Sequence, residues 1–540
     1  MKFRSIILIA FVFTHMSTTS AQAINLVLGR PTDTSITFSL MLDKNASFYF
    51  QLGTAPKNYT INTVNYTVNA GQPTEIEVSG LASNTQYFYR LAYKTTDATS
   101  ISYSDEYSFY TQRARNNIFS FAVEADPHLD TNTTPESYTL SLKHMLSKKV
   151  DFLVDLGDNT MNDKLPVIND STIKDRNILF RKYFSDLTHS ASLFVVMGNH
   201  EGELGWLANT SLSNLPTTAV NLRKTYYPNP FPNGFYSGNK IQTAGVGFRE
   251  NYYAWEWGNA LFVVIDPYFY TQSKPGWGWT LGQDQYNWLE ATLKGSTAKF
   301  KFVFSHQLVG GSGTDGRGGT EFAHLYEMGG YNDDSTYGFT KYRPGWSMPI
   351  HKLFVQYKVN IFFHGHDHCY VRQVKDGVIY QEVPQPSAKN INTITGTAYG
   401  YKEGVFLPSR GYMLVTVGVD SANIDYVRTY LPSEENSNRK NGDVAYSYSV
   451  KTGLLTSVRE LAKIELVKIL PNPAKSMIRV ETAQKFNTFS YRLIDYTGRL
   501  YQTGSTYQIN LSGLNPGHYL LQMKCDNFYV NKKIVLTNLP

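Results

Sequence analysis

Five short segments of the chain concentrate the side chains that bind metal ions. They are Asp126-Pro127-His128, Gly157-Asp158-Asn159, Gly198-Asn199-His200-Glu201, Ser305-His306-Gln307 and His364-Gly365-His366-Asp367-His368. Six of the twelve histidines fall within them, which a random scatter of histidines would not produce. Carboxylate, imidazole and amide ligands suit divalent ions such as Mn, Fe or Zn rather than copper. Two such ions about 3.5–4 Å apart can share a hydroxide and stabilise an in-line displacement at phosphorus.

Each segment directly follows a run of apolar residues that is typical of a buried strand. The runs are 118–125, 150–157, 192–198, 299–305 and 360–365. Helical signals lie between the strands, such as Thr134-Pro135, a capping residue followed by a proline of the first turn. Strands of this kind that lead into polar loops predict an α/β layered core over residues 117–430, buried on both faces. Ligands of such sheets bind at the carboxyl ends of the strands, where the five segments lie.

The ordered set D-x-H, GD, GNHE, H and GHxH resembles the calcineurin-like metallophosphoesterase superfamily. The stretches ENYYAWEWGNALFVVID and QYNWLEATL, with a β-rich segment before the catalytic region, further resemble purple acid phosphatases. The resemblance implies a four-layer β-sandwich core of the α/β (α+β) class, flanked by all-β sandwich domains at both ends. It also implies two bound divalent metal ions, with Mn, Fe and Zn as candidates.

The resemblance carries roles onto matching positions of this chain. Asp126, His128 and His368 would bind one metal, Asn199, His306 and His366 the other, and Asp158 would bridge both. His200 would contact the phosphate together with Asn199. It would then protonate the leaving group or stabilise the transition state, because the pKa of an imidazole lies near neutrality.

The chain departs from the purple subgroup at two positions. The tyrosine ligand of that subgroup falls on Met161, and the histidine that it lacks is present as His128. We therefore expect His128 to replace the tyrosinate, and we expect no tyrosinate-to-iron absorption band.

Supporting residues are less specific. Arg317, in a glycine-rich loop after His306, could reach a phosphate oxygen or belong to a plain surface loop. His364 is expected behind the ligands, Glu124 in a structural ion pair, and Cys369 as a small buried residue.

Charge and cysteine content exclude several classes of protein. The net charge of +6 is spread over 540 residues without a Lys/Arg run, so no nucleic-acid scaffold is expected. Two cysteines exclude a disulfide framework. A hydrophobic fraction of 42% excludes a wholly disordered chain.

The chain divides into five parts by pattern. Residues 1–23 have the basic start, short apolar run and Ala21-Gln22-Ala23 ending of a secretory signal peptide, and the run is shorter than the ~20 residues of a membrane span. Residues 24–113 predict a β-sandwich, and the stretch from Leu81 to Arg90 resembles a fibronectin type III corner. After the catalytic region, 431–463 is polar and predicts a linker, and 464–540 predicts a β-rich unit. No other stretch is long enough to cross a membrane.

The last unit resembles the C-terminal sorting domain of the type IX secretion system. The resemblance rests on PNPAKSMIRV, IDYTGRL, LSGLNPGHYLLQM and the terminal KKIVL. It implies the type IX machinery as a partner, and a secreted or outer-surface protein that passes through the periplasm.

The leading hypothesis is a secreted binuclear metal phosphatase that hydrolyses phosphate monoesters, small-molecule substrates, by attack of a metal-bridging hydroxide. The alternative within chemistry is a phosphodiesterase or nucleotide-cleaving phosphohydrolase with the same metal site. The alternative that is not an enzyme is a surface adhesion protein with an inactive core, which the intact set of candidate ligands disfavours.

Overall fold

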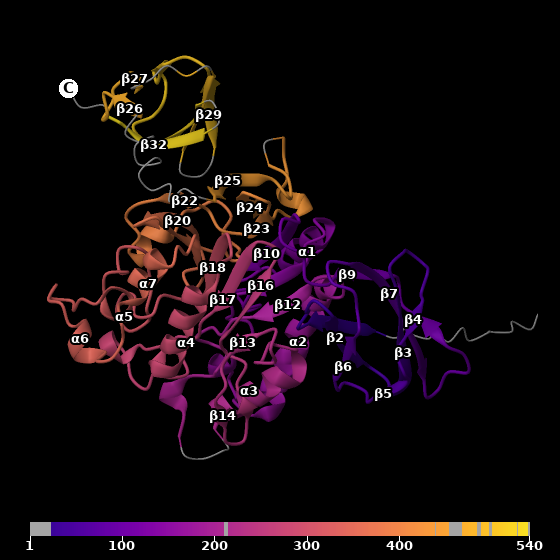
Figure 1. Cartoon of the computed structure of the whole chain (residues 1–540). Coiled ribbons are helices and arrows are strands. Elements are labelled where there is room, and N and C mark those ends of the chain that lie inside the picture. The colour runs from indigo at the N-terminus through magenta and orange to yellow at the C-terminus, as the bar shows by residue number, and fades with distance from the viewer. Residues whose placement is uncertain are drawn as a thin grey trace, which may run out of the picture.

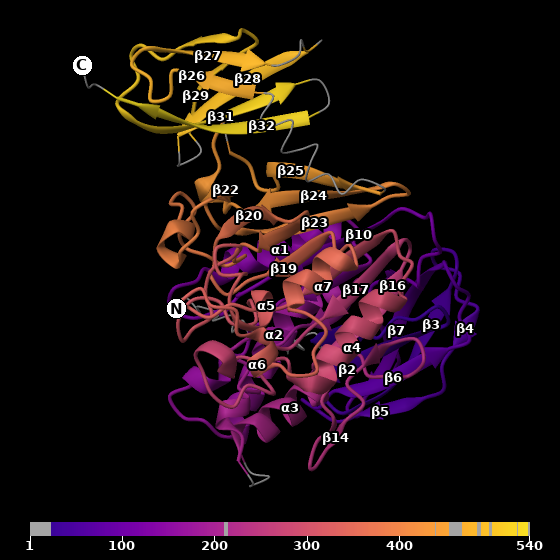
Figure 2. The ribbon, with the colours of Figure 1, turned by 60° about the vertical axis from the view of Figure 1, so that its left-hand side comes forward.

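The computed structural model describes residues 23–209, 214–437, 439–452, 467–482, 486, 488–495, 499–525 and 528–537. The predicted signal peptide, apart from Ala23, lies outside the described residues. Three bodies follow one another along the chain: an N-terminal β-sandwich, a large α/β domain and a C-terminal β-sandwich (Figure 1 and Figure 2). Among the described helices, none has the length and apolarity required to span a membrane.

The N-terminal domain packs two antiparallel sheets around an aromatic core. One sheet has the order β1 (Ile24–Gly29), β2 (Ser35–Leu42), β6 (Thr74–Ser79); the other contains β3 (Ala46–Gly53), β4 (Ile61–Asn62), β5 (Tyr66–Val68), β7 (Gln86–Thr95), β8 (Ser102–Tyr103) and β9 (Tyr107–Tyr110). Phe38 and Phe50 stack at its centre. The Tyr87 hydroxyl accepts a hydrogen bond from the Ala82 amide at 2.8 Å, which fixes the corner between two strands. The β-sandwich is confirmed; its fibronectin type III relationship stays a prediction.

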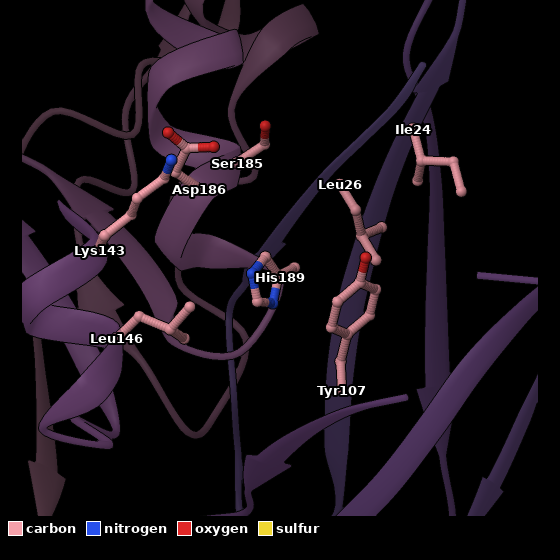
Figure 3. A pocket seen from close by; sticks show the side chains of 8 residues that line it. All are labelled: Ile24, Leu26, Tyr107, Lys143, Leu146, Ser185, Asp186 and His189. Atoms are coloured by element: carbon pink, nitrogen blue, oxygen red, sulfur yellow. The ribbon is translucent and has the colours of Figure 1, made fainter. Parts of the chain in front are cut away.

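The N-terminal domain is docked on the α/β domain by buried hydrogen bonds. The Arg181 guanidinium donates to the carbonyl of Ser39, and the Tyr89 hydroxyl donates to the carbonyl of His189. A cavity of about 420 Å³ lies along this interface. Figure 3 shows Leu26 and Tyr107 of the first domain facing His189 of the second. No candidate metal ligand lines this cavity.

Two sheets form the middle of the α/β domain. The six-stranded sheet has the order β12 (Ser192–Val195), β11 (Phe152–Asp155), β10 (Phe119–Glu124), β23 (Gly411–Val417), β24 (Ser421–Arg428), β25 (Val444–Lys451). The eight-stranded sheet has the order β13 (Ser237–Gly238), β16 (Tyr253–Trp257), β17 (Ala260–Val264), β18 (Phe300–Phe304), β19 (Ile361–His364), β21 (Val378–Glu382), β20 (Tyr370–Lys375), β22 (Val405–Leu407). A small hairpin pairs β14 (Gln242–Thr243) with β15 (Gly247–Phe248).

Helices cover the outer face of each sheet. On the six-stranded sheet lie α1 (Pro135–Ser147), α2 (Asp170–Thr188) and α3 (Leu215–Tyr226), and on the eight-stranded sheet lie α4 (Gly282–Gly295) and α7 (Ile350–Gln356). The short helices α5 (Tyr326–Gly329) and α6 (Phe339–Tyr342) belong to a long excursion before α7. Between the sheets, Phe121, Phe152 and Phe262 form a fully buried aromatic core. This arrangement confirms the predicted four-layer core. Helix α1 begins after Thr134, as the sequence predicts.

One segment differs from the sequence prediction. Residues 431–463 were expected to form a linker, but 444–451 form β25, which pairs with β24 along its length. The segment VAYSYSVK alternates, so that Tyr446 and Tyr448 pack against the core between the sheets while polar residues face outward. The α/β domain therefore extends beyond residue 430.

The C-terminal domain is an all-β sandwich. One sheet has the order β26 (Val467–Leu470), β27 (Met477–Thr482), β30 (Gln508–Asn510); the other has the order β29 (Leu500–Gly504), β28 (Phe489–Asp495), β31 (Gly517–Cys525), β32 (Phe528–Leu536). Leu493, Leu521 and Ile534 are fully buried between them. Cys369 is buried, as expected, and it is a free cysteine; the side chain of Cys525 lies outside the described residues.

Candidate metal centre

The five predicted segments meet at one edge of the two central sheets. Strands β10, β11 and β12 are parallel, with Val123 opposite Val154 and Val154 opposite Phe194. In the other sheet β18 and β19 are parallel, with Phe304 opposite Phe363. Because parallel strands in register end side by side, the loops that follow them converge at their carboxyl ends.

Two groups of metal-binding side chains form there. The first comprises Asp126, His128 and His368, and the second comprises Asp158, His306 and His366. Within each group the ligand atoms all lie within 4.8 Å of one another. Asp158 Oδ2 lies 3.2 Å from His306 Nε2 in its own group and 3.7 Å from His128 Nε2 in the other. Asp158 therefore faces both groups, as a bridging ligand must.

The donor atoms fit a pair of metal ions. Asp126 Oδ1, Asn199 Oδ1, His128 Nε2 and His306 Nε2 are buried and have no hydrogen-bond partner. Leaving such a group unpaired costs about 1–3 kcal/mol, so four together indicate a missing partner. Ligands about 2.0–2.2 Å from one ion stand about 3–3.6 Å apart. The separation of His368 Nε2 from Asp126 Oδ1, 3.4 Å, lies in this range, and that of His128 Nε2 from the same oxygen, 3.7 Å, lies just above it.

In each of two histidines, a hydrogen bond to one ring nitrogen determines which nitrogen is left to bind a metal. The Nδ1 atom of His306 lies 2.9 Å from the carbonyl oxygen of Leu156, which leaves Nε2 for a ligand. The Nε2 atom of His366 lies 2.8 Å from the carbonyl oxygen of Asp315, which leaves Nδ1. Such bonds orient a metal-binding imidazole.

Electrostatics favour cations in this region. Burial raises the pKa of the Asp158 carboxyl, but the charge of His306 and the histidines around it outweighs burial and holds the pKa well below its usual range. Burial lowers the pKa of His306, but Asp158 and Asp126 outweigh burial and raise it to about 9. Two buried carboxylates thus create a negative potential that divalent ions would neutralise.

His200 lies at the open side of the two groups. Its backbone amide donates to Asp158 Oδ1 at 2.8 Å, and its Nε2 atom lies 3.9 Å from Asp158 Oδ2. Its Nδ1 atom lies 2.9 Å from Asp163 Oδ1. The Asp163 carboxylate therefore orients the ring so that Nε2 faces the groups. Asp163 could not be predicted from the sequence, since no motif spacing marks it.

Glu201 holds the ligand loops together. Its carboxylate accepts the backbone amides of Asp158 at 3.0 Å, Asn159 at 2.6 Å and Gly198 at 2.6 Å. Gly198 is required here because an added Cβ would lie 2.4 Å from Asp158 Oδ1. The glutamate of the GNHE segment thus ties the loop after β11 to the loop after β12.

Arg176 of α2 ties the first ligand loop to the second. Its guanidinium donates to the carbonyl oxygen of His128, and also to those of Thr160 at 2.9 Å and Asn159 at 3.2 Å. All three acceptors are main-chain atoms next to candidate ligands. Arg176 was also missed from the sequence.

The remaining predicted residues lie around the groups. Arg317 Nη1 donates to Asp367 Oδ1 at 3.0 Å and to the carbonyl oxygen of His366 at 3.1 Å, so it supports the ligand loop, and its contact with phosphate stays a prediction. His364 Nδ1 lies 2.7 Å from Glu382, behind the ligands as expected. Glu124 accepts the Tyr138 hydroxyl at 2.8 Å, a hydrogen bond rather than the expected ion pair.

Comparison with known proteins agrees with this geometry. Residues 119–370 match the family model of the calcineurin-like phosphoesterases. The α/β domain is a calcineurin-like phosphoesterase domain. Residues 468–537 match the secretion system C-terminal sorting domain. No curated protein matches the chain.

Two solved structures resemble much of the chain. PhoD matches with a TM-score of 0.59 and 15% identity, over 79% of this chain and 90% of PhoD. A purple acid phosphatase from yellow lupin (Lupinus luteus) seeds matches with a TM-score of 0.53 and 15% identity, over 80% of this chain and 74% of the lupin enzyme. At this identity the similarity concerns the fold.

The family of the catalytic domain implies a metal-dependent phosphoester hydrolase with a dinuclear divalent metal site. The C-terminal type IX sorting domain indicates export to the cell surface or secretion.

Proposed function

We propose that this protein is an exported phosphatase that hydrolyses phosphate monoesters with two divalent ions. Asp126, His128 and His368 would hold one ion and Asn199, His306 and His366 the other, with Asp158 shared. The observation that carries the proposal is the position of Asp158 between the two groups, with 3.2 Å to His306 and 3.7 Å to His128. Export would begin with the predicted signal peptide and pass through the periplasm.

Two divalent ions at this site supply Lewis acidity and an activated water for in-line displacement at phosphorus. The side chains of this protein would bind the substrate and transfer the proton. Asn199 and His200 would bind phosphate oxygens at the open side of the site. Asp163 would keep the His200 ring turned toward the leaving group, to which His200 Nε2 would pass a proton as the ester bond breaks.

Charge balance favours monoesters over diesters. Asp126 and Asp158 are the two carboxylates of the ligand groups, and against two divalent ions they leave a charge near +2. A phosphate group that carries one or two negative charges matches this positive charge, and a monoester dianion is attracted to it more strongly than a diester monoanion. This electrostatic preference supports phosphomonoesterase activity as the main function.

The test compares the hydrolysis of p-nitrophenyl phosphate and its bis ester by the full chain loaded with Mn, Zn or Fe. We expect two equivalents of metal by elemental analysis, loss of activity on chelation and a higher kcat/KM for the monoester. A higher kcat/KM for the bis ester would establish the diesterase alternative. Protein that binds no metal and hydrolyses neither ester would instead support the alternative of a surface adhesion protein with an inactive core.

His200→Ala tests the assigned proton donor. The variant should keep both metals and lose about 10²–10⁴-fold in kcat on esters with poor leaving groups. His324→Ala is the matched control, because His324 is exposed and lies outside both groups. Full activity of His200→Ala on such esters would overturn the assignment.

A further inference from the structure

Asp367 lies between two candidate metal ligands and belongs to neither ligand group. In the chain it separates His366 of the second group from His368 of the first. It is 1% exposed, so its carboxylate is shielded from water. A buried carboxylate that binds no metal must be stabilised by other donors, because burial of an unpaired charge is costly.

Three donors hold the Asp367 carboxylate. Arg317 Nη1 donates to Oδ1 at 3.0 Å, and the Gly318 amide and the Tyr401 hydroxyl donate to Oδ2 at 2.8 and 2.9 Å. The backbone amide of Asp367 donates to Glu382 Oε1 at 3.0 Å. The side chain and the backbone of Asp367 are therefore both fixed, by groups from three other parts of the chain.

The two ligands next to Asp367 have backbone conformations that need such support. His366 and His368 have φ angles of 80° and 54°, in the left-handed region that is unfavourable for residues with a Cβ. Arg317 also donates to the carbonyl oxygen of His366 at 3.1 Å, so one guanidinium binds the carboxylate and the backbone beside it. Because Asp367 connects the two histidines, a displaced Asp367 would move an imidazole of each group.

We propose that Asp367 is a positioning residue that holds His366 and His368 in the direction of the two ions. Arg317 and Tyr401 act through it, because their hydrogen bonds keep the carboxylate in place. The role requires no contact between Asp367 and an ion or the substrate. This inference rests on the proposed function, in which both histidines bind metal.

The experiment titrates the metal-free full chain with Mn²⁺ and with Co²⁺. Asp367→Ala should weaken the binding of both ions by about 10–100-fold, because it removes the acceptor of all three donors. Asp367→Asn, which keeps one carbonyl oxygen, should recover part of this loss. The visible absorption of bound Co²⁺ reports the geometry of its ligands, and it should change in both variants.

Tyr401→Phe tests the same role with a milder change, and it decides the matter if Asp367→Ala does not fold. It removes one hydrogen bond to the carboxylate, so metal binding should weaken about three- to tenfold and the Co²⁺ spectrum should change. The control is Tyr412→Phe, a buried tyrosine whose hydroxyl lies 2.8 Å from His144 Nδ1. The control should keep the wild-type affinity and spectrum.

The control for Asp367→Ala is Asp151→Ala. Asp151 is also buried and accepts the Arg113 guanidinium at 2.7 and 2.8 Å and the Trp257 indole at 2.9 Å. It directly precedes β11, whereas the metal ligands follow the carboxyl ends of the strands. Asp151→Ala should lower the free energy of unfolding about as much as Asp367→Ala does, and should keep the wild-type metal affinity and Co²⁺ spectrum.

Two results would overturn the inference while the proposed function stands. One is unchanged metal affinity with an unchanged Co²⁺ spectrum in Tyr401→Phe and in Asp367→Ala. The other is an equal loss of affinity in Asp367→Ala and Asp151→Ala, because the loss would then follow from lower stability alone. A wild-type chain that binds fewer than two ions would instead overturn the proposed function, and the inference with it.

Discussion

The Nδ1 atom of His200 lies 2.9 Å from Asp163 Oδ1 and 3.1 Å from Asp163 Oδ2. One carboxylate thus faces the back of the imidazole whose other nitrogen faces the ligand groups. Such a pairing fixes the tautomer and direction of a ring that transfers a proton. It gives Asp163 a positioning role without contact with the substrate.

Asp163→Asn should lower kcat about tenfold or more while the KM and the two bound metals stay unchanged. The reason is that the His200 ring would lose the carboxylate that orients it, whereas the metal ligands would stay in place. Steady-state kinetics and elemental analysis measure both. Asp175→Asn, an exposed residue of the neighbouring helix, is the control. A loss of metal in Asp163→Asn would point to a structural role instead.

Asp158→Asn should remove most of the tightly bound metal and the activity, because an amide cannot supply the charge shared by the two groups. Isothermal titration with Mn would detect the loss. Retention of two ions with wild-type affinity would show that Asp158 is not the shared ligand.

Arg176→Met should weaken binding of the ion next to His128 by about tenfold, as is usual when a residue that orients a ligand is removed. Arg176→Lys should recover little, since a single ammonium cannot reach three carbonyl oxygens at once. Arg115→Met, at an exposed position, is the control. Metal titration checks the expectation; equal affinities in all three variants would contradict it.

His189 should make the interface between the first two domains sensitive to acid. Burial lowers its pKa to about 4, despite the opposing charge of Asp105, with Lys143 and Asp186 lining the same cavity. The unfolded chain binds a proton below about pH 6.5 and the folded chain only below about pH 4. Titration of His189 therefore leaves the free energy of unfolding unchanged above about pH 6.5 and lowers it as the pH falls toward 4.

We expect a loss of about 2 kcal/mol over that range, after allowance for solvent screening of the partly exposed ring. Urea unfolding at pH 7 and pH 4.5 measures it. His189→Gln, which does not titrate, should lose less stability between the two pH values. The same loss in wild type and variant would rule out His189 as the source.

The sequence predicted the ligand segments because each follows an apolar strand, a relationship that local pattern contains. Asp163 and Arg176 escaped prediction because their partners lie 37 and 48 residues away, and only the packing of loops and α2 brings them together. Strand β25 was not predicted because the polar stretch SEENSNRKNGD directly precedes it and is typical of a linker. The positions of Asp163, Arg176 and β25 all depend on contacts between distant parts of the chain, and local residue preferences determine none of them.

Five candidate ligands share an unusual backbone conformation. Asp126, His128, Asp158, His366 and His368 all have positive φ angles, between 48° and 80°. This left-handed region costs a residue with a Cβ about 1–2 kcal/mol. Without ions, the loops would gain by relaxing and the orphaned ligand atoms by turning to water. Bound metal ions should therefore stabilise the backbone conformation of these loops. Chelation should increase amide hydrogen exchange in the loops before it affects the sheets that carry them.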